Sequence, residues 1–192
     1  MNESPTPGRH AATIRQMIEQ APPFRPEATP DELVAEFASG QHRLAAFLAL
    51  CSRGDLALPA IRRGLTDVNW HIRHWSAIVA DNVADAETLR VLVPLLHDPR
   101  ADVRAWAVHS LSCESCKEGP NPIDAVPLLL ERIERDSHLK VRRQAVAMLA
   151  HHRRPDPRVL PVFKKILSEE TDHKLRLHAA QGVTRYLAAG VS

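Results

Sequence analysis

One phrase recurs five times along this chain, and its spacing constrains the fold more than any other feature. Each copy has an Arg, a small residue three positions later, and an Ala or a larger aliphatic residue seven positions later. Positions three, four and seven residues apart share one helix face, so each copy predicts a helix with one buried face. The arginines are separated by 30, 31, 38 and 34 residues and are Arg43, Arg73, Arg104, Arg142 and Arg176.

A second apolar segment precedes each Arg helix, and four of these segments contain a proline. A proline is tolerated best in the first turn of a helix, so we expect each one near a helix start. The prolines are Pro59, Pro94, Pro127 and Pro161. The repeating unit is therefore predicted to be a helix, a short polar turn and a second helix. The predicted pairs span residues 30–52, 55–83, 85–113, 121–152 and 155–188.

An acidic residue lies six positions before the Arg in four of the five copies, whereas the first copy has Phe37 there. A guanidinium has several donors, so it can bond turn carbonyls and an acid of an adjacent repeat together. We predict a structural Arg–acid ladder along the stack, with unrelated surface charges as the alternative. The acids are Asp67, Asp98, Asp136 and Glu170, and the arginines are Arg73, Arg104, Arg142 and Arg176.

The phrases Asp-x5-Arg and Val/Ile/Leu-Arg-x2-Ala/Ser resemble HEAT repeats, specifically the short bacterial type named after phycobilisome lyases, over roughly residues 30–188. The resemblance implies an all-α solenoid, or superhelix, of about five helix pairs whose second helices line the concave side. It also implies a non-catalytic protein-binding scaffold or adaptor. It does not imply lyase activity, because such repeats serve many functions. HEAT-type di-iron hydroxylases bind metal through His-Glu pairs, and no His-Glu dipeptide occurs here.

The first 29 residues differ from the rest of the chain. They are rich in proline and contain one helical stretch, so we expect an N-terminal arm over 1–29 and a solenoid over 30–192. No apolar run approaches the roughly 18 residues of a membrane span, and the start of the sequence is polar. We therefore expect a cytoplasmic protein without a membrane segment, whose three cysteines do not form a disulfide framework.

The positions one, two, five and nine residues after each Arg are predicted to face the concave groove. Two tryptophans on neighbouring second helices would form an apolar patch that can also donate hydrogen bonds, as in many binding hot spots. A different helix rotation, which would place the tryptophans in the core, is the alternative. The candidate partner-binding residues are His74, Trp75, Ile78, Trp106, His109 and Arg143.

The longest step between repeats contains the sequence His109-x3-Cys113-x2-Cys116. His109 and Cys113 are four residues apart and share a helical face. His151 lies nine positions after its repeat Arg, as Cys113 does in the preceding repeat, and it is the candidate fourth ligand. Two thiolates and two imidazoles suit a tetrahedral Zn²⁺ site, so a metal- or redox-responsive module is an alternative function. A buried Cys113, a reversible Cys113–Cys116 disulfide, or no role for the pair remain open.

Charge is distributed unevenly along the chain. Residues 137–192 hold 11 basic and 4 acidic residues, although the whole chain has a net charge of only +2. A basic end can bind nucleic acid, which is a further alternative function, or it can be a solvated terminal repeat. The sequence lacks the Gly-x4-Gly-Lys-Ser/Thr phosphate loop and the Gly-x-Ser-x-Gly elbow, so we expect no enzyme and no obligatory cofactor.

Overall fold

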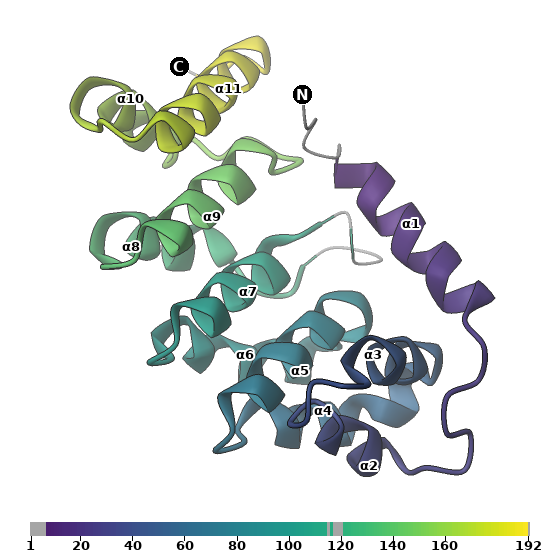
Figure 1. Cartoon of the computed structure of the whole chain (residues 1–192). Coiled ribbons are helices and arrows are strands. Elements are labelled where there is room, and N and C mark those ends of the chain that lie inside the picture. The colour runs from purple at the N-terminus through teal and green to yellow at the C-terminus, as the bar shows by residue number, and fades with distance from the viewer. Residues whose placement is uncertain (1–6, 115, 117–120, 192) are drawn as a thin grey trace. The chain divides into compact units, whose positions relative to one another are not determined.

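The computed structural model describes residues 7–114, 116 and 121–191, and this part of the chain is helical without strands (Figure 1). The helices pair as the sequence predicts, with short turns between the two members of each pair. In chain order they are α1 (Pro7–Gln20), α2 (Pro30–Ala35), α3 (Arg43–Ser52), η1 (Gly54–Ala57), α4 (Leu58–Leu65), α5 (Trp70–Val83), α6 (Ala86–Leu92), η2 (Val93–His97), α7 (Ala101–Ser112), α8 (Ala125–Arg135), α9 (Leu139–Ala150), α10 (Leu160–Glu169) and α11 (His173–Ala188).

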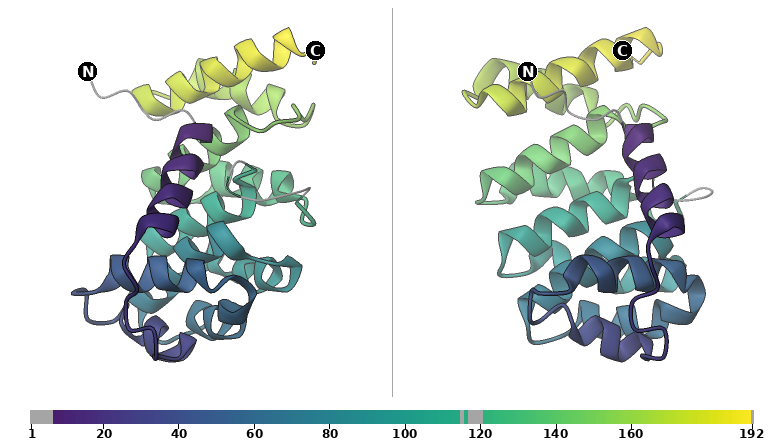
Figure 2. Two further views of the ribbon diagram at one scale, coloured as in Figure 1. Left: turned by 90° about the vertical axis from the view of Figure 1, so that its right-hand side faces the viewer. Right: turned by 45° about the vertical axis from the view of Figure 1, so that its right-hand side comes forward.

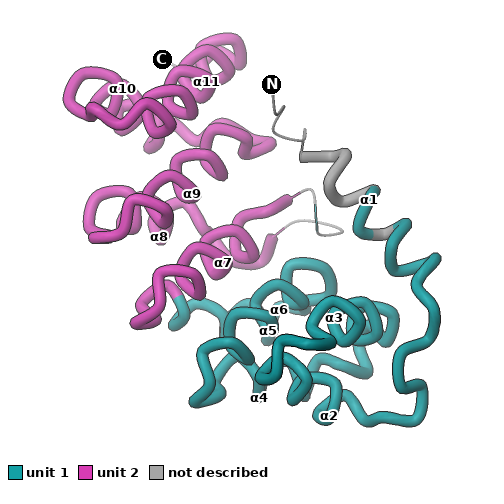
Figure 3. Tube along the Cα trace, in the orientation of Figure 1, with its two compact units in different colours: residues 1–95, 115–119 teal, residues 96–114, 120–192 magenta. Residues whose placement is uncertain are grey.

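The chain forms two compact units, which are coloured separately in Figure 3. The N-terminal unit comprises residues 1–95 and 115–119, and the C-terminal unit comprises residues 96–114 and 120–192. In the N-terminal unit, α5 packs against α3 and α4, and α1 contacts α3. In the C-terminal unit, α9 lies between α7 and α11, as the two views of Figure 2 show. The second helices of neighbouring pairs are thus direct neighbours within each unit.

The residue three positions after each repeat Arg is completely buried. Its side chain is small in all five copies, which allows the neighbouring helix to approach closely. These residues are Ala46, Ser76, Ala107, Ala145 and Ala179, each 0% exposed. The predicted buried face of the second helices is therefore confirmed. The residue seven positions after the Arg extends this face in four copies, where Leu50, Ala80, Leu111 and Leu149 are buried, whereas Val183 is half-buried.

Side-chain caps set where most of the pairs begin. Thr29 accepts a hydrogen bond from the amide of Glu32, whose carboxylate accepts one from the amide of Thr29, so the two residues form a capping box. Asp and Asn side chains accept bonds from the first-turn amides of later helices, which otherwise lack partners. These further caps are Asn69, Asp85, Asp124 and Asp172.

One proline departs from its predicted place at a helix start. Pro59, Pro127 and Pro161 lie within the first three residues of α4, α8 and α10. Pro94 instead follows the end of α6 at Leu92, and the chain continues as the 3-10 helix η2. The proline ring has no N–H and would clash with the carbonyl four residues earlier, so the α-helix ends before it.

Gly182 of α11 provides a test of the packing between α10 and α11. A Cβ atom at this position would lie 2.3 Å from Cε2 of Phe163, which is 0% exposed and packs edge-on against Tyr186. A Gly→Ala change inside a helix ordinarily stabilises it by about 0.5–1 kcal/mol. Here we expect Gly182→Ala to destabilise the chain by about 1–3 kcal/mol, because the added methyl group would force the buried ring of Phe163 to shift. Thermal or urea unfolding measures the effect.

Gln181→Ala is the matched control, because Gln181 is the exposed neighbour of Gly182 on the same helix. Its effect on unfolding should be within about 0.5 kcal/mol. A Gly182→Ala protein as stable as the original, or more stable, would show that the α10–α11 packing is not as described.

Candidate functional site

The repeat Arg bonds the backbone of the turn that precedes its own helix. In four of the five repeats the guanidinium donates to the carbonyl of the residue six positions earlier. The donor–acceptor distances are 2.7 Å from Arg43 to Phe37, 2.8 Å from Arg73 to Asp67, 2.8 Å from Arg104 to Asp98 and 3.3 Å from Arg176 to Glu170. The bond needs only a carbonyl, so the first repeat makes it although Phe37 replaces the acid.

The acid at the same position folds the turn. An Asp carboxylate accepts a hydrogen bond from the amide two residues later at 2.7–2.9 Å in three repeats. This is the side-chain turn that Asp forms readily, and it leads the chain into the second helix. The three bonds join Asp67 to Asn69, Asp98 to Arg100, and Asp136 to His138.

Two rungs of the predicted Arg–acid ladder are present within the C-terminal unit. Arg104 bonds both carboxylate oxygens of Asp136 in the next repeat, at 2.7 and 2.8 Å, and Arg142 bonds Glu170 at 3.3 Å. The Arg104 and Asp136 side chains are only 13% and 1% exposed. Burial alone would raise the pKa of Asp136, but bonds from Arg104 and from the His138 amide lower it below its ordinary value. The pair therefore remains charged and joins two repeats.

On α5 of the N-terminal unit, three of the candidate partner-binding residues are half-buried. These are His74, Trp75 and Ile78, beside the fully buried Ser76 and Ala77. The indole of Trp75 stacks on Phe37 at a centroid distance of 5.7 Å and meets Phe47 edge-on at 6.4 Å. Part of this ring therefore belongs to an aromatic cluster of the core, so the predicted exposed position and its core alternative each describe part of Trp75.

The candidate residues of the C-terminal unit differ in their surroundings. Trp106 and His109 of α7 are half-buried and meet edge-on at 5.1 Å. The Nδ1 atom of His109 is 3.2 Å from the amide nitrogen of Gln144 on α9. Arg143 bonds both oxygens of Asp172, the cap of α11, with an Nε–Oδ1 distance of 2.9 Å. The charge of Arg143 is thus already neutralised within the unit.

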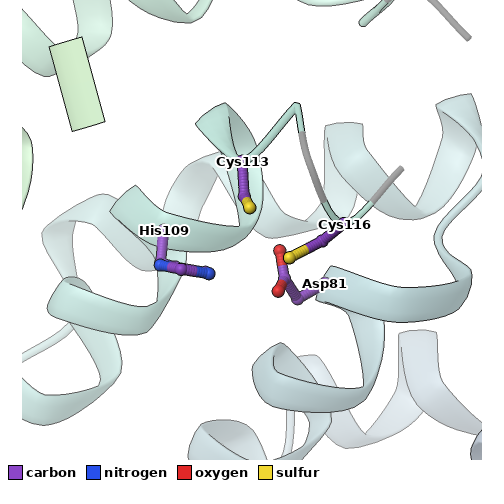
Figure 4. A group of neighbouring side chains, drawn as sticks. All are labelled: Asp81, His109, Cys113 and Cys116. Atoms are coloured by element: carbon purple, nitrogen blue, oxygen red, sulfur yellow. The ribbon is translucent and has the colours of Figure 1, made fainter. Parts of the chain in front are cut away.

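The residues predicted to bind metal lie at the end of α7 and just beyond it. In the C-terminal unit, a ring nitrogen of His109 and the sulfur of Cys113 lie within 4.8 Å of each other (Figure 4). In the N-terminal unit, the same limit applies to a carboxylate oxygen of Asp81 and the sulfur of Cys116. Only two residues separate the cysteines in the chain, and none of the three cysteines forms a disulfide.

His151, the predicted fourth ligand, belongs to neither of these pairs. It is the C-cap of α9, where desolvation and the neighbouring His178 and Arg185 lower its pKa. The sequence analysis missed Asp81, which is only 3% exposed. The position eight residues after the repeat Arg is otherwise occupied by small residues, namely Cys51, Ser112, Ala150 and Thr184. An acid at this position of the repeat was therefore the sequence signal that could have drawn attention to Asp81.

Several of the basic residues near the C-terminus are paired with acids. Arg158 bonds Asp124 at 3.0 Å and Asp156 at 2.7 Å, which holds the pKa of Asp156 below its ordinary value. Arg142 and Arg143 are paired with Glu170 and Asp172, as described above. The excess of basic residues in this part of the sequence therefore does not produce an equally large patch of uncompensated charge.

Comparison with known proteins agrees with this repeat geometry. A family model described as HEAT repeats matches residues 31–112 and 113–184, which together make up most of the sequence. The chain belongs to the HEAT-repeat family. Its fold class is accordingly that of an all-α repeat solenoid, as the resemblance of its Arg-containing phrases implied.

A solved structure with a similar fold is the crystal structure of an engineered protein from the Northeast Structural Genomics Consortium. It has 18% sequence identity and a TM-score of 0.53, and the alignment covers 93% of this HEAT-repeat chain and 84% of the other. At this identity the likeness shows the fold alone. No curated protein matches the sequence. None of the described helices is both long and apolar enough to cross a bilayer.

The Arg104–Asp136 pair provides a test of the ladder. We expect Asp136→Asn to destabilise the chain by about 2–4 kcal/mol, because it leaves the charge of a mostly buried Arg104 without its partner. The matched control is Asp31→Asn, which breaks the Arg63–Asp31 pair, whose side chains are 61% and 57% exposed. Its cost should stay below about 1 kcal/mol. Urea unfolding at pH 7 measures both, and equal effects would contradict the buried rung.

The same pair predicts a pH dependence. The pKa of Asp136 is lower in the folded chain than the value of about 4 for an unfolded Asp. Its stabilising contribution is therefore complete above pH 4 and is lost as the pH falls through the folded-state value. The difference in unfolding free energy between the original chain and Asp136→Asn should shrink as the pH is lowered below about 4, and a constant difference would contradict the assignment.

Proposed function

We propose that this HEAT-repeat chain is a non-catalytic scaffold that binds another protein through the outward side of its second helices. HEAT repeats generally act as protein-interaction scaffolds, which supports the class of function. The observation on which the proposal rests is apolar exposure on these helices. Leu44 of α3 and Leu177 of α11, each directly after a repeat Arg, are 53% and 46% exposed.

Half-buried residues on two other second helices also support the proposal. His74, Trp75 and Ile78 lie on α5 in the N-terminal unit, and Trp106 and His109 lie on α7 in the C-terminal unit. Large aromatic and aliphatic side chains that remain partly accessible contribute most of the energy at many interfaces. Arg143 contributes less charge than its position suggests, because Asp172 already pairs with it.

The ion pairs of the basic residues favour a protein partner over nucleic acid. Phosphate binding requires Lys and Arg side chains that exchange counterions for phosphates. Arg142, Arg143 and Arg158 bond acids of this chain instead. No enzymatic function is proposed.

The proposal is tested by affinity isolation of the partner with quantitative mass spectrometry, followed by binding measurements with the purified partner. Ile78→Glu and Trp106→Ala alter the proposed surface in each unit, and we expect each to weaken binding at least about tenfold. Val68→Glu is the matched control, because Val68 is 99% exposed in the turn before α5. Helical circular dichroism of each variant verifies folding. Unchanged binding by both surface variants would contradict the proposal.

A further inference from the structure

We propose that the outward side of α9 and α11 in the C-terminal unit binds an acidic segment of the partner protein. The inference rests on the proposed scaffold function and adds the chemistry of the segment that the scaffold binds. The amino-acid sequence supplies the first argument. α9 and α11 each contain three Lys or Arg residues, and neither contains an Asp or a Glu. The acids among the described residues of this unit lie instead in the turns, on α8 and α10, and at the two ends of α7.

Ion pairs within the unit neutralise the three cations of α9, whereas Arg185 of α11 bonds a neutral group. The pairs of α9 are Lys140–Asp102, Arg142–Glu170 and Arg143–Asp172. Arg185 donates to the backbone carbonyl of Ala150 at 3.3 Å. A carbonyl carries no net charge, so this bond positions the guanidinium and leaves its positive charge in place.

Two histidines lie beside Arg185. His178 and Arg185 are seven residues apart, so they share one face of α11 with Gln181 between them. Oε1 of Gln181 is 3.4 Å from Nδ1 of His178. Desolvation, His178 and Arg185 together lower the pKa of His151 at the end of α9, so these two groups of α11 lie near it. All four side chains are exposed or half-buried, and they form an accessible cluster of hydrogen-bond donors.

A carboxylate complements this cluster. The guanidinium and the imidazole N–H groups donate hydrogen bonds, and bonds from a cation to a carboxylate are stronger than those between neutral groups. The repulsion that disfavours the charged form of His151 is relieved when an anion lies beside it. A nucleic-acid backbone requires a row of Lys and Arg that neutralise successive phosphates, whereas one arginine with two histidines suits a small number of carboxylates. The cluster therefore favours an acidic protein segment.

Trp106 extends the binding face onto α7. α9 lies between α7 and α11 (Figure 1), and Gln144 and His178 occupy the same repeat position on their helices as Trp106 on α7. The amide nitrogen of Gln144 is 3.2 Å from Nδ1 of His109, which meets Trp106 edge-on at 5.1 Å. The face thus changes from cationic on α11 through polar on α9 to aromatic on α7. A segment with acidic residues close to a large apolar residue complements this order.

Selection of peptides on the purified full chain tests the inference. The probe is a displayed library of random peptides about twelve residues long, and we expect the selected peptides to be enriched in Asp and Glu relative to the starting library. Binding of the best resynthesised peptide, measured by fluorescence anisotropy, should weaken at least about tenfold in Arg185→Glu and in His178→Glu. The matched control is Lys164→Glu, which makes the same charge change as Arg185→Glu at an exposed position of α10 and should bind within about twofold of the original chain. Circular dichroism of each variant verifies folding.

The outcomes separate this inference from the scaffold function. Selected peptides without acidic enrichment, no selection above background, or equal binding by Arg185→Glu and Lys164→Glu would each overturn the acidic partner class. Tighter binding of a labelled oligothymidylate than of any selected peptide, with loss of that binding in Arg185→Glu, would also overturn it and assign the face to nucleic acid. The scaffold function fails separately, if the partner isolated by affinity binds the Ile78→Glu and Trp106→Ala chains as tightly as the original.

Discussion

The hydrogen bond from the repeat Arg to the carbonyl six residues earlier is the interaction on which the rest of the structure depends. It is present for Arg43, Arg73, Arg104 and Arg176, whether the residue that supplies the carbonyl is acidic or not. A turn between two packed helices leaves carbonyls without partners, and such groups are costly when they are shielded from water. One guanidinium supplies several donors at the point where they are needed, so the four helix pairs that make this bond share the same connection between turn and second helix.

The acid of the turn also joins neighbouring repeats. Asp136 bonds the amide of His138 in its own turn and the guanidinium of Arg104 in the preceding repeat. One carboxylate therefore fixes the start of its own second helix and the register between two repeats. Since stacked repeats contact only their neighbours, stability depends on such local interfaces. The fully buried small residues three positions after each Arg then determine how closely adjacent second helices approach.

Much of the fold was predictable from the sequence because the repeat encodes it locally. The spacing of Arg, small residue and aliphatic residue indicated the second helices and their buried face. Pro94 was misplaced because a proline eight residues into a segment ends an α-helix without ending the repeat. Trp75 was only half understood, since its packing depends on Phe37 and Phe47 in the preceding repeat, which its own helix does not indicate.

The candidate metal residues were likewise predictable from the sequence only in part. The sequence indicated His109 and Cys113, which form a pair in the C-terminal unit, and Cys116, but it proposed His151 and missed that Asp81 lies close to Cys116 in the N-terminal unit. A contact between residues that are distant in sequence depends on tertiary packing, which the position within the repeat did not predict. The acid at a repeat position that otherwise holds small residues was visible in the sequence.

Amide hydrogen exchange of an Arg104→Lys chain tests the central role of the Arg most directly. A lysine ammonium cannot bond the carbonyl of Asp98 and both oxygens of Asp136 together. We therefore expect faster exchange at the amides of Arg100 and His138, which lie in the two turns that Arg104 joins, and unchanged exchange at Asn69 in the N-terminal unit. Exchange that is unchanged in both turns, or faster only in the turn that contains Arg100, would contradict the account.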